Sequence, residues 1–149
     1  MLTQAEFETL INDPAKVIDG DITWTQERSP RSGFRVEILS PAGYPLFLKG
    51  SYNPIIVALS YHIIHRTVGR IYGLDLGKDH RNPNGQRVGE KHKHRWRESL
   101  RDKEAYIPPD ITAPATEPVR VWEQFCQEAK IHHNGSMDTP PPTQLDLFL

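Results

Sequence analysis

The stretch from residue 53 to residue 76, NPIIVALSYHIIHRTVGRIYGLDL, constrains the fold more than any other part of the chain. Its β-branched and aromatic residues fall at both odd and even positions, which is typical of strands that are buried on both faces. The short segment at residues 67–69 divides the stretch in two. We therefore expect two long strands that meet at this segment and form the centre of a sheet.

Shorter alternating segments lie on both sides of that stretch. Three of them precede it, at residues 22–24, 34–38 and 46–48, and they are separated by the turn sequences SPRSG and SPAGYP. Another one, KHKHRWR at residues 91–97, follows the tight turn NPNG at residues 82–85. Alternation with a period of two between turns is typical of consecutive antiparallel strands. The whole pattern predicts a sheet of about five to seven strands.

The first residues of the chain predict a short helix over residues 3–12. Thr3 followed by Glu6 is a capping box, which marks a helix N-terminus. The pair Asp13-Pro14 ends the helix because the residue before a proline avoids helical geometry. The apolar residues of this segment fall on one helical face: Phe7, Leu10 and Ile11.

A second helix is predicted at residues 118–131, PVRVWEQFCQEAKI. Its apolar residues form one stripe, which indicates that this helix packs on the sheet. The fold class is therefore α+β, a mainly antiparallel sheet with an N-terminal helix and a C-terminal helix packed on it. We expect a single domain over residues 1–131, followed by a flexible proline-rich linker and a binding motif over residues 132–149. The stripe consists of Val119, Trp122, Phe125, Cys126 and Ala129.

The composition excludes several classes of protein. The net charge of −1, from 18 Lys and Arg against 19 Asp and Glu, gives no overall attraction to nucleic acid or to an anionic membrane, so any such binding needs a local patch. The single cysteine, Cys126, excludes an internal disulfide and a zinc site made of several thiolates. No stretch approaches the ~20 apolar residues of a membrane span, and the acidic start lacks the basic flank of a signal peptide. We expect a soluble cytoplasmic protein without a membrane partner.

The sequence TQLDLFL, at residues 143–149, follows three consecutive prolines. It concentrates large apolar residues in a segment where a hydrophobic core cannot easily use them. Gln144-Leu145-Asp146-Leu147-Phe148 resembles the short peptide by which many bacterial replication and repair proteins bind the DNA polymerase sliding clamp, whose pattern is Gln, an aliphatic residue, Ser or Asp, Leu and Phe. The resemblance implies that the bacterial sliding clamp is a partner of this chain.

A peptide ligand of this kind has a physical basis. Leu147 and Phe148 are expected to fill an apolar pocket, while the amide of Gln144 satisfies polar groups at a shallower subsite. Burial of each anchor contributes about 1.5–3 kcal/mol, but ordering the tail costs part of that free energy, so we expect a reversible contact of micromolar affinity. The alternative is that the apolar residues fold back and cover a groove on the same domain.

The segment KHKHRWR predicts a strand with two chemically distinct sides. His92 and His94 are two residues apart and project from one face, with Trp96 beyond them. His80, on the polar loop before the strand, is positioned to return to the same place. The basic residues project from the other face and form a positive stripe that suits the phosphates of nucleic acid: Lys91, Lys93, Arg95 and Arg97, extended by Arg101.

Three interpretations of this strand remain open. In the first, His80, His92 and His94 cleave RNA by acid–base chemistry without a metal or cofactor. Tyr106 adds an aromatic surface to this site, and the phosphorane is stabilised by Arg97, Arg101 or Lys103.

In the second interpretation, His92, His94 and Glu98 ligate a metal, because the pattern H-x-H-x-x-x-E resembles the first ligand motif of cupins. No later histidine on a strand completes that cupin set. In the third, the segment is a solvated edge strand whose charges discourage pairing with other strands. His62 and His65, on the apolar central strand, are expected to be structural.

Residues 71–107 also resemble an uncharacterised family of small bacterial domains. The shared features are the N-P-N-G turn at residues 82–85, the H-x-H strand, the R-E pair at residues 97–98 and D-K-E-A-Y at residues 102–106. In that family a proline precedes the first histidine, where this chain has Lys91. The histidine strand alone resembles small toxins of toxin–antitoxin modules, which implies a cognate antitoxin as a partner.

The sequence thus supports two compatible functions. As a binding protein, the chain attaches to the sliding clamp through its tail and acts on, or interferes with, DNA replication or repair, as a toxin or an inhibitor. As an enzyme, it is a small metal-independent nuclease of a toxin–antitoxin module, and the tail only localises it. A phage or plasmid inhibitor that blocks a host machine by shape alone is a third possibility.

Overall fold

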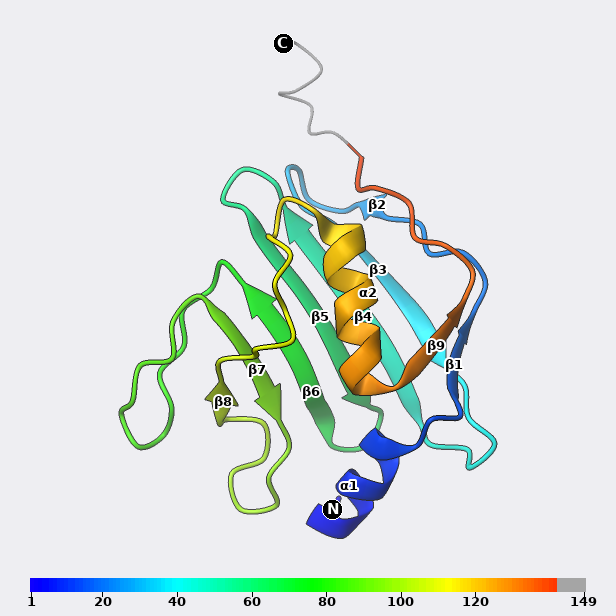
Figure 1. Cartoon of the computed structure of the whole chain (residues 1–149), viewed down its shortest axis with the longest axis vertical. Coiled ribbons are helices and arrows are strands. Elements are labelled where there is room, and N and C mark those ends of the chain that lie inside the picture. Colours follow the sequence, from blue (N-terminus) through cyan, green and yellow to red (C-terminus); the bar gives the residue numbers. More distant parts are fainter. Residues whose placement is uncertain (142–149) are drawn as a thin grey trace.

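A computed structural model of the chain describes residues 1–141, which form an α+β fold (Figure 1). Seven strands make one antiparallel sheet in the order β2-β3-β4-β5-β6-β7-β8, and two further strands form a small parallel sheet. The predicted fold class is confirmed. In chain order the elements are α1 (Gln4–Asn12), β1 (Lys16–Asp19), β2 (Thr25–Gln26), β3 (Ser32–Ile38), β4 (Leu46–Asn53), β5 (Ala58–His65), β6 (Gly69–Leu76), β7 (Lys91–Arg95), β8 (Ala105–Tyr106), α2 (Pro118–Ala129) and β9 (Ile131–Asn134).

The long apolar stretch forms β5 and β6, as the sequence predicts. The two strands pair in antiparallel fashion and are joined by a short turn before Gly69, whose φ of 97° suits glycine. β5 is the middle strand of the seven. The register shifts by one residue between Ile63 and Ile64, which is a β-bulge.

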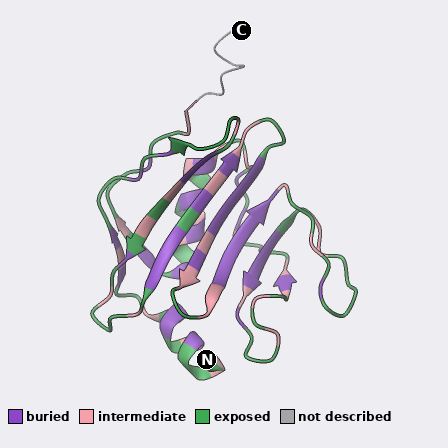
Figure 2. Ribbon diagram, turned by 180° about the vertical axis from the view of Figure 1, so that it is seen from behind, coloured by how far each residue is buried: buried purple, intermediate pink, exposed green. Residues whose placement is uncertain are grey.

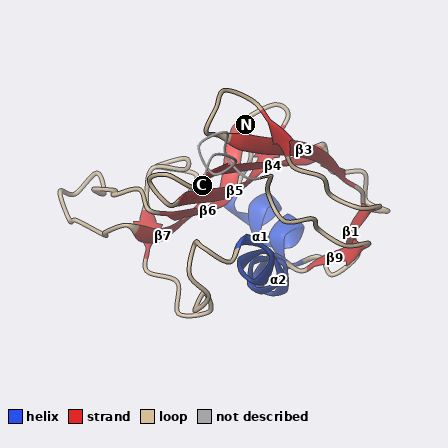
Figure 3. Cartoon of the chain, turned by 90° about the horizontal axis from the view of Figure 1, so that it is seen from above, coloured by secondary structure: helices blue, strands red, loops and turns tan. Residues whose placement is uncertain are grey.

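Both helices lie on one side of the large sheet (Figure 3). The capping box of α1 is present, because the Thr3 side chain accepts from the Glu6 amide and the Glu6 side chain accepts from the Thr3 amide. α2 packs through an aromatic cluster in which the ring centroids of Tyr61 and Trp122 lie 5.3 Å apart. The core therefore fills the space between the helices and one face of the sheet.

Neither α1 nor α2 lies on the other face of the large sheet, which Figure 2 shows from behind. Side chains alternate between the two faces along each strand. On β5, for example, Tyr61 and Ile63 are fully buried on the helix side, whereas His62 on the open side is partly exposed. Polar side chains on the open face are therefore available to a ligand.

The expected linker from residue 132 onward is wrong for its first part. β9 pairs in parallel with β1, with His132 opposite Val17. The side chain of Met137 is buried, and the amide of Asp138 donates to the carbonyl of Ile22 at 3.0 Å. Parallel pairing of two four-residue strands from opposite ends of the chain leaves no local periodicity, so the sequence pattern does not reveal it. The clamp-like motif at residues 144–148 lies outside the described residues.

Neither of the two described helices is both long enough and apolar enough to cross a membrane.

Candidate metal centre

β7 is an inner strand of the sheet, between β6 and β8. His92, Lys93 and His94 are 2%, 0% and 3% exposed, so the interpretation of this segment as a solvated edge strand is wrong. The short strand β8 pairs with β7 and so covers the edge that the sequence pattern leaves open. The alternation is nevertheless as predicted, since His92 and His94 project from the open face and Lys93 from the helix face.

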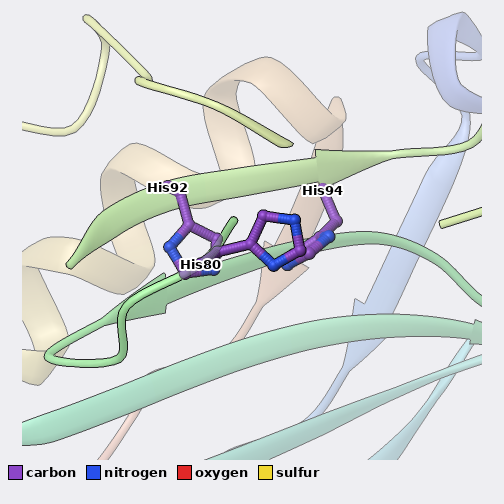
Figure 4. Close-up of side chains that lie close together, drawn as sticks. All are labelled: His80, His92 and His94. Atoms are coloured by element: carbon purple, nitrogen blue, oxygen red, sulfur yellow. The ribbon is translucent and has the colours of Figure 1, made fainter. Parts of the chain in front are cut away.

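Three imidazole rings gather on the open face of β7 (Figure 4). His80 reaches them from the loop between β6 and β7, as the sequence predicts, and its ring centroid lies 5.3 Å from that of His92 and 4.6 Å from that of His94. The centroids of His92 and His94 are 4.9 Å apart. One nitrogen from each ring lies within 4.8 Å of the other two.

Each of the three rings uses one nitrogen to contact a backbone carbonyl. A carbonyl oxygen only accepts, so the nitrogen that faces it carries the hydrogen, and in a neutral ring the other nitrogen then carries a lone pair. The lone pairs fall on Nδ1 of His80 and on Nε2 of His92 and His94. The carbonyls belong to Lys103, Gly89 and Asp102, at 2.9, 2.9 and 2.7 Å from His80 Nε2, His92 Nδ1 and His94 Nδ1 respectively.

Asp75 on β6 points its carboxylate at the same place. Its Oδ2 lies 3.3 Å from Nε2 of His92 and 3.7 Å from Nε2 of His94. Its Oδ1 is already occupied, because it accepts hydrogen bonds from the Ser60 hydroxyl at 2.6 Å and from Nε2 of His62 at 3.0 Å. The carboxylate is therefore fixed with one oxygen turned toward the histidines.

The protonation of this group suits a cation. Burial alone would raise the pKa of Asp75, but hydrogen bonds from His62 and Ser60, together with the His92 imidazole close by, outweigh it and hold the pKa well below its ordinary value. Burial lowers the pKa of His94 to about 4, and the charge of the Arg70 guanidinium acts in the same direction. At neutral pH the site thus has a charged carboxylate beside at least one neutral imidazole.

A pocket of about 540 Å³ opens above the cluster. Arg70 is held at its wall by Asp102, with Nε 2.8 Å from Oδ2, and its NH1 lies 3.6 Å from Oδ2 of Asp75. The ammonium group of Lys78 donates to the Ser60 hydroxyl at 3.2 Å. The lining of the pocket thus carries four cations, Arg70, Lys78, Arg81 and Lys103, against three carboxylates, Asp75, Asp79 and Asp102.

Two of the residues predicted to be catalytic lie elsewhere. Arg97 forms an ion pair with Glu104, with Nε 3.1 Å from Oε1. Tyr106 lies on the helix side, where its hydroxyl donates to Glu128 at 2.8 Å and burial raises its pKa. Both assignments to the histidine site are wrong. Lys103, which is also predicted to be catalytic, does line the pocket with the histidines.

The cupin-like ligand set is also wrong. Oε1 of Glu98 accepts a hydrogen bond from the backbone amide of Gln4 at 2.9 Å, so this carboxylate belongs to the junction with α1. Trp96 leaves the histidine face too, because its indole is buried and donates to the carbonyl of Leu2 at 3.0 Å. The β-bulge in the neighbouring strands changes the alternation at this end of the sheet.

The predicted positive stripe does not exist as a free surface. Its central member, Lys93, is fully buried and lies 2.6 Å from Asp110 and 3.1 Å from Glu128. The outer members are occupied as well. Lys91 donates to the carbonyl of Ile111, Arg95 pairs with Glu8, Arg97 pairs with Glu104, and Arg101 donates to the carbonyl of Val68.

The sequence pattern missed three residues of the site: Asp75, His62 and Ser60. A usable signal was present at Asp75, which is a lone carboxylate inside the apolar run YGLDL. A buried carboxylate needs partners, so its position alone predicts nearby donors or a cation. His62 sits opposite Gly73, where a Cβ atom would lie 2.6 Å from its ring, so the missing side chain gives this imidazole room to lean over β6.

Comparison with known proteins gives a family but no activity. The chain belongs to DUF6978, a family of unknown function, whose model matches residues 2–131. No curated protein and no solved structure matches the chain.

Proposed function

We propose that this member of the family binds a divalent transition metal at His80, His92, His94 and Asp75 and uses it to hydrolyse a substrate. The observation that supports this proposal is the orientation of the three imidazoles. Each of them has one ring nitrogen within hydrogen-bond distance of a backbone carbonyl, and one nitrogen of each ring lies within 4.8 Å of the other two. This arrangement is the usual one for histidines that ligate a metal, because the second hydrogen bond fixes the tautomer and the ring.

A cation also resolves an imbalance in the site. Three lone pairs and one carboxylate oxygen converge, and all four are acceptors. The Arg70 guanidinium, with NH1 3.6 Å from Oδ2 of Asp75, balances part of this set, and a proton or a metal ion among the nitrogens would balance the rest. Imidazole nitrogens favour zinc and its neighbours in the first transition row, and Zn–N bonds of 2.0–2.1 Å bring ligand nitrogens to about 3.3 Å from one another. His80, on a partly exposed loop, is the ligand that can close this remaining distance.

The chemistry follows from the open pocket. Four protein ligands fill a tetrahedral zinc site, so water would bind at a fifth position that the open pocket leaves accessible. A bound water molecule with a pKa near 7 is a nucleophile at neutral pH. The cations that line the pocket favour an anionic substrate. The predicted metal-free nuclease uses the same histidines and stays a prediction. Unlike the metal-dependent activity proposed here, cleavage by a metal-free nuclease should persist when a chelator is added.

Metal binding tests the centre directly. We expect one zinc ion per chain by calorimetry after treatment with EDTA, and loss of that binding in His92→Ala. Asp75→Asn should weaken it about tenfold to a hundredfold. His132→Ala is the matched control, because His132 is an exposed imidazole on β9 outside the cluster. Equal zinc affinity for wild type and His92→Ala would contradict the proposed metal centre.

The hydrolytic part needs a separate assay. We expect the zinc-loaded protein to cleave a generic phosphodiester, bis(4-nitrophenyl) phosphate, and to lose this activity on chelation and in His92→Ala. Cleavage of an RNA substrate that persists in EDTA would instead support the metal-free nuclease.

A second proposal comes from the sequence of the tail. We propose that residues 144–148 bind the bacterial sliding clamp, which places the protein in the cytoplasm and at replication or repair. The support is agreement at all five positions of the clamp-binding pattern. Because Asp138 still bonds to the fold, a shortened protein should end after residue 141 and leave Met137 in place.

Clamp binding can be measured independently of the metal. We expect micromolar binding of purified clamp to the full chain and none to the chain that ends after residue 141. Replacing Gln144, Leu147 and Phe148 together with alanine should have the same effect. His92→Ala serves as a control that keeps the tail. Equal affinity of the full and shortened chains would contradict the clamp proposal.

A further inference from the structure

The open face of the large sheet carries a groove of about 660 Å³ beside the histidine pocket. Its charged lining is four cations, Arg31, Arg35, Lys49 and Lys78, and one carboxylate, Glu27. All four cations are exposed. This is a marked excess of positive charge in a chain whose net charge is −1.

Within residues 1–141, these cations are not paired with carboxylates, although Lys78 donates a hydrogen bond to the Ser60 hydroxyl and Arg35 lies over the ring of Phe47. Two other cations near this face are already paired, since Arg66 is bound to Glu37 and Arg70 to Asp102. The groove therefore presents positive charge that is free for a ligand.

The groove and the histidine pocket form one continuous track. Strand pairing places Arg35 opposite Lys49, Lys49 opposite His62, His62 opposite Gly73 and Gly73 opposite His94. Directly opposed residues share a face, so this row crosses five neighbouring strands on the open side. Lys78 lines both cavities. The row spans four strand spacings, roughly 19 Å.

We propose that the open face binds single-stranded nucleic acid and leads one phosphodiester of the strand to the histidine centre. As a statement about the substrate this rests on the proposed function, whereas binding to the face does not need the metal. A length of roughly 19 Å matches the shortest footprints of single-strand-binding sheets, about four nucleotides. The row of cations follows a sugar–phosphate backbone, and the His62 imidazole, which lies over Gly73, forms the middle of the track.

The shape favours a single strand over a duplex. His92 and His94 are almost fully buried on the floor of the pocket, so a reacting phosphate has to enter it. One extended strand can do this, but a rigid double helix cannot bend into the cavity. The guanidinium of Arg35 lies 3.8 Å above the ring of Phe47, which holds it in place. An unpaired base can stack on a planar guanidinium of this kind.

Fluorescence anisotropy with a labelled oligouridine of about 12 nucleotides tests this surface in EDTA-containing buffer. We expect the double variant Arg35→Glu/Lys49→Glu to bind about tenfold or more weakly than wild type. Its salt dependence should be shallower, with a log–log slope reduced by about 1.4, because two phosphate contacts are lost. The matched control is Arg120→Glu/Lys130→Glu, which changes the net charge equally at α2 and its C-terminal cap, on the helix side of the sheet.

The remaining arms separate the alternatives. The control variant should bind the strand as wild type does, while a duplex of the same length and polyglutamate should bind more weakly. Equal binding by wild type and the groove variant, equal loss in the control variant, or a preference for either competitor would overturn the proposal. Strand binding without zinc binding would support the proposed nucleic-acid surface and contradict the proposed metal centre. Zinc binding without strand binding would do the reverse.

Discussion

Polar side chains project from both faces of β7, but the two faces differ in how these side chains are paired. On the open face, His92 and His94 meet His80 and Asp75, and the atoms that converge are all acceptors. On the helix face, Lys93 supplies its ammonium hydrogens to Tyr72, Asp110 and Glu128. Both groups are buried to a similar degree at the strand. They differ in their balance of donors and acceptors.

That balance distinguishes a structural network from a binding site. The helix-face network is nearly closed, because each hydrogen of Lys93 finds an oxygen and the hydroxyls of Tyr72 and Tyr106 both donate to Glu128. It joins β7 to α2 and to the segment before that helix. In the open-face cluster the Arg70 guanidinium is shared between Asp75 and Asp102, so positive charge balances the acceptors less completely there. Changes on one face should therefore alter stability, and changes on the other should alter ligand affinity.

The largest expected effect is that of Lys93→Ala. Removing one partner of a buried ion pair leaves Asp110 and Glu128 without compensation and typically costs 3–5 kcal/mol. We expect the free energy of unfolding, measured with urea, to fall by about that amount. Zinc affinity of the folded fraction should be unchanged.

Lys91→Ala is the matched control, since Lys91 is an exposed lysine on the same strand. Its loss should cost well under about 1 kcal/mol. A mild effect of Lys93→Ala, similar to that of the control, would show that the helix-face network does not hold the fold together.

The next effect is that of Tyr72→Phe, which removes a single hydroxyl from the closed network. Hydrogen bonds to charged groups contribute about 1.5–3 kcal/mol, and Tyr72 both accepts from Lys93 and donates to Glu128. We expect a loss of about 2 kcal/mol by urea unfolding. Tyr106→Phe, which removes a bond to the same carboxylate at a less buried position, should cost less. The reverse order would contradict the picture of Lys93 as the centre of this network.

The overall fold was predictable from local sequence patterns. The apolar stretch that became β5 and β6, the capping box of α1 and the stripe of α2 are each contained within a few turns or strands of the chain. The exceptions are the two-residue strands β2 and β8, which the local patterns do not predict at these positions, and above all the pair β1 and β9. Their pairing joins residues more than 100 positions apart, such as Val17 and His132, and only the completed fold brings them together.

The site was predictable only in part, for the same reason. His80, His92 and His94 were identified because they are close in sequence and carry a recognisable spacing. Asp75 and His62 come from other strands, and their contact with the cluster depends on the register of the sheet. The prediction of a free basic surface fails because strand alternation predicts the face from which a side chain projects, but not the carboxylates that lie on that face.

The smallest expected effect concerns His62, which the sequence pattern assigns to the structure alone. Its Nε2 donates to Oδ1 of Asp75, on the far side of the carboxylate from the histidine cluster. We therefore expect His62 to act as a positioning residue. His62→Leu should reduce zinc affinity about tenfold, as is common for partners that orient a metal ligand, and should leave urea stability almost unchanged because His62 is partly exposed.

His62→Gln tests whether this effect depends on the hydrogen bond. Glutamine retains a donor for Asp75, so we expect it to recover most of the zinc affinity that leucine loses. Calorimetry on the three proteins provides the measurement. If leucine lowers stability and glutamine restores it while zinc affinity stays constant in both, then His62 is structural, and the open face resembles the closed one more than its geometry suggests. If affinity alone changes, the ligand set extends across three strands, and β7 separates a surface that stabilises the fold from one that binds.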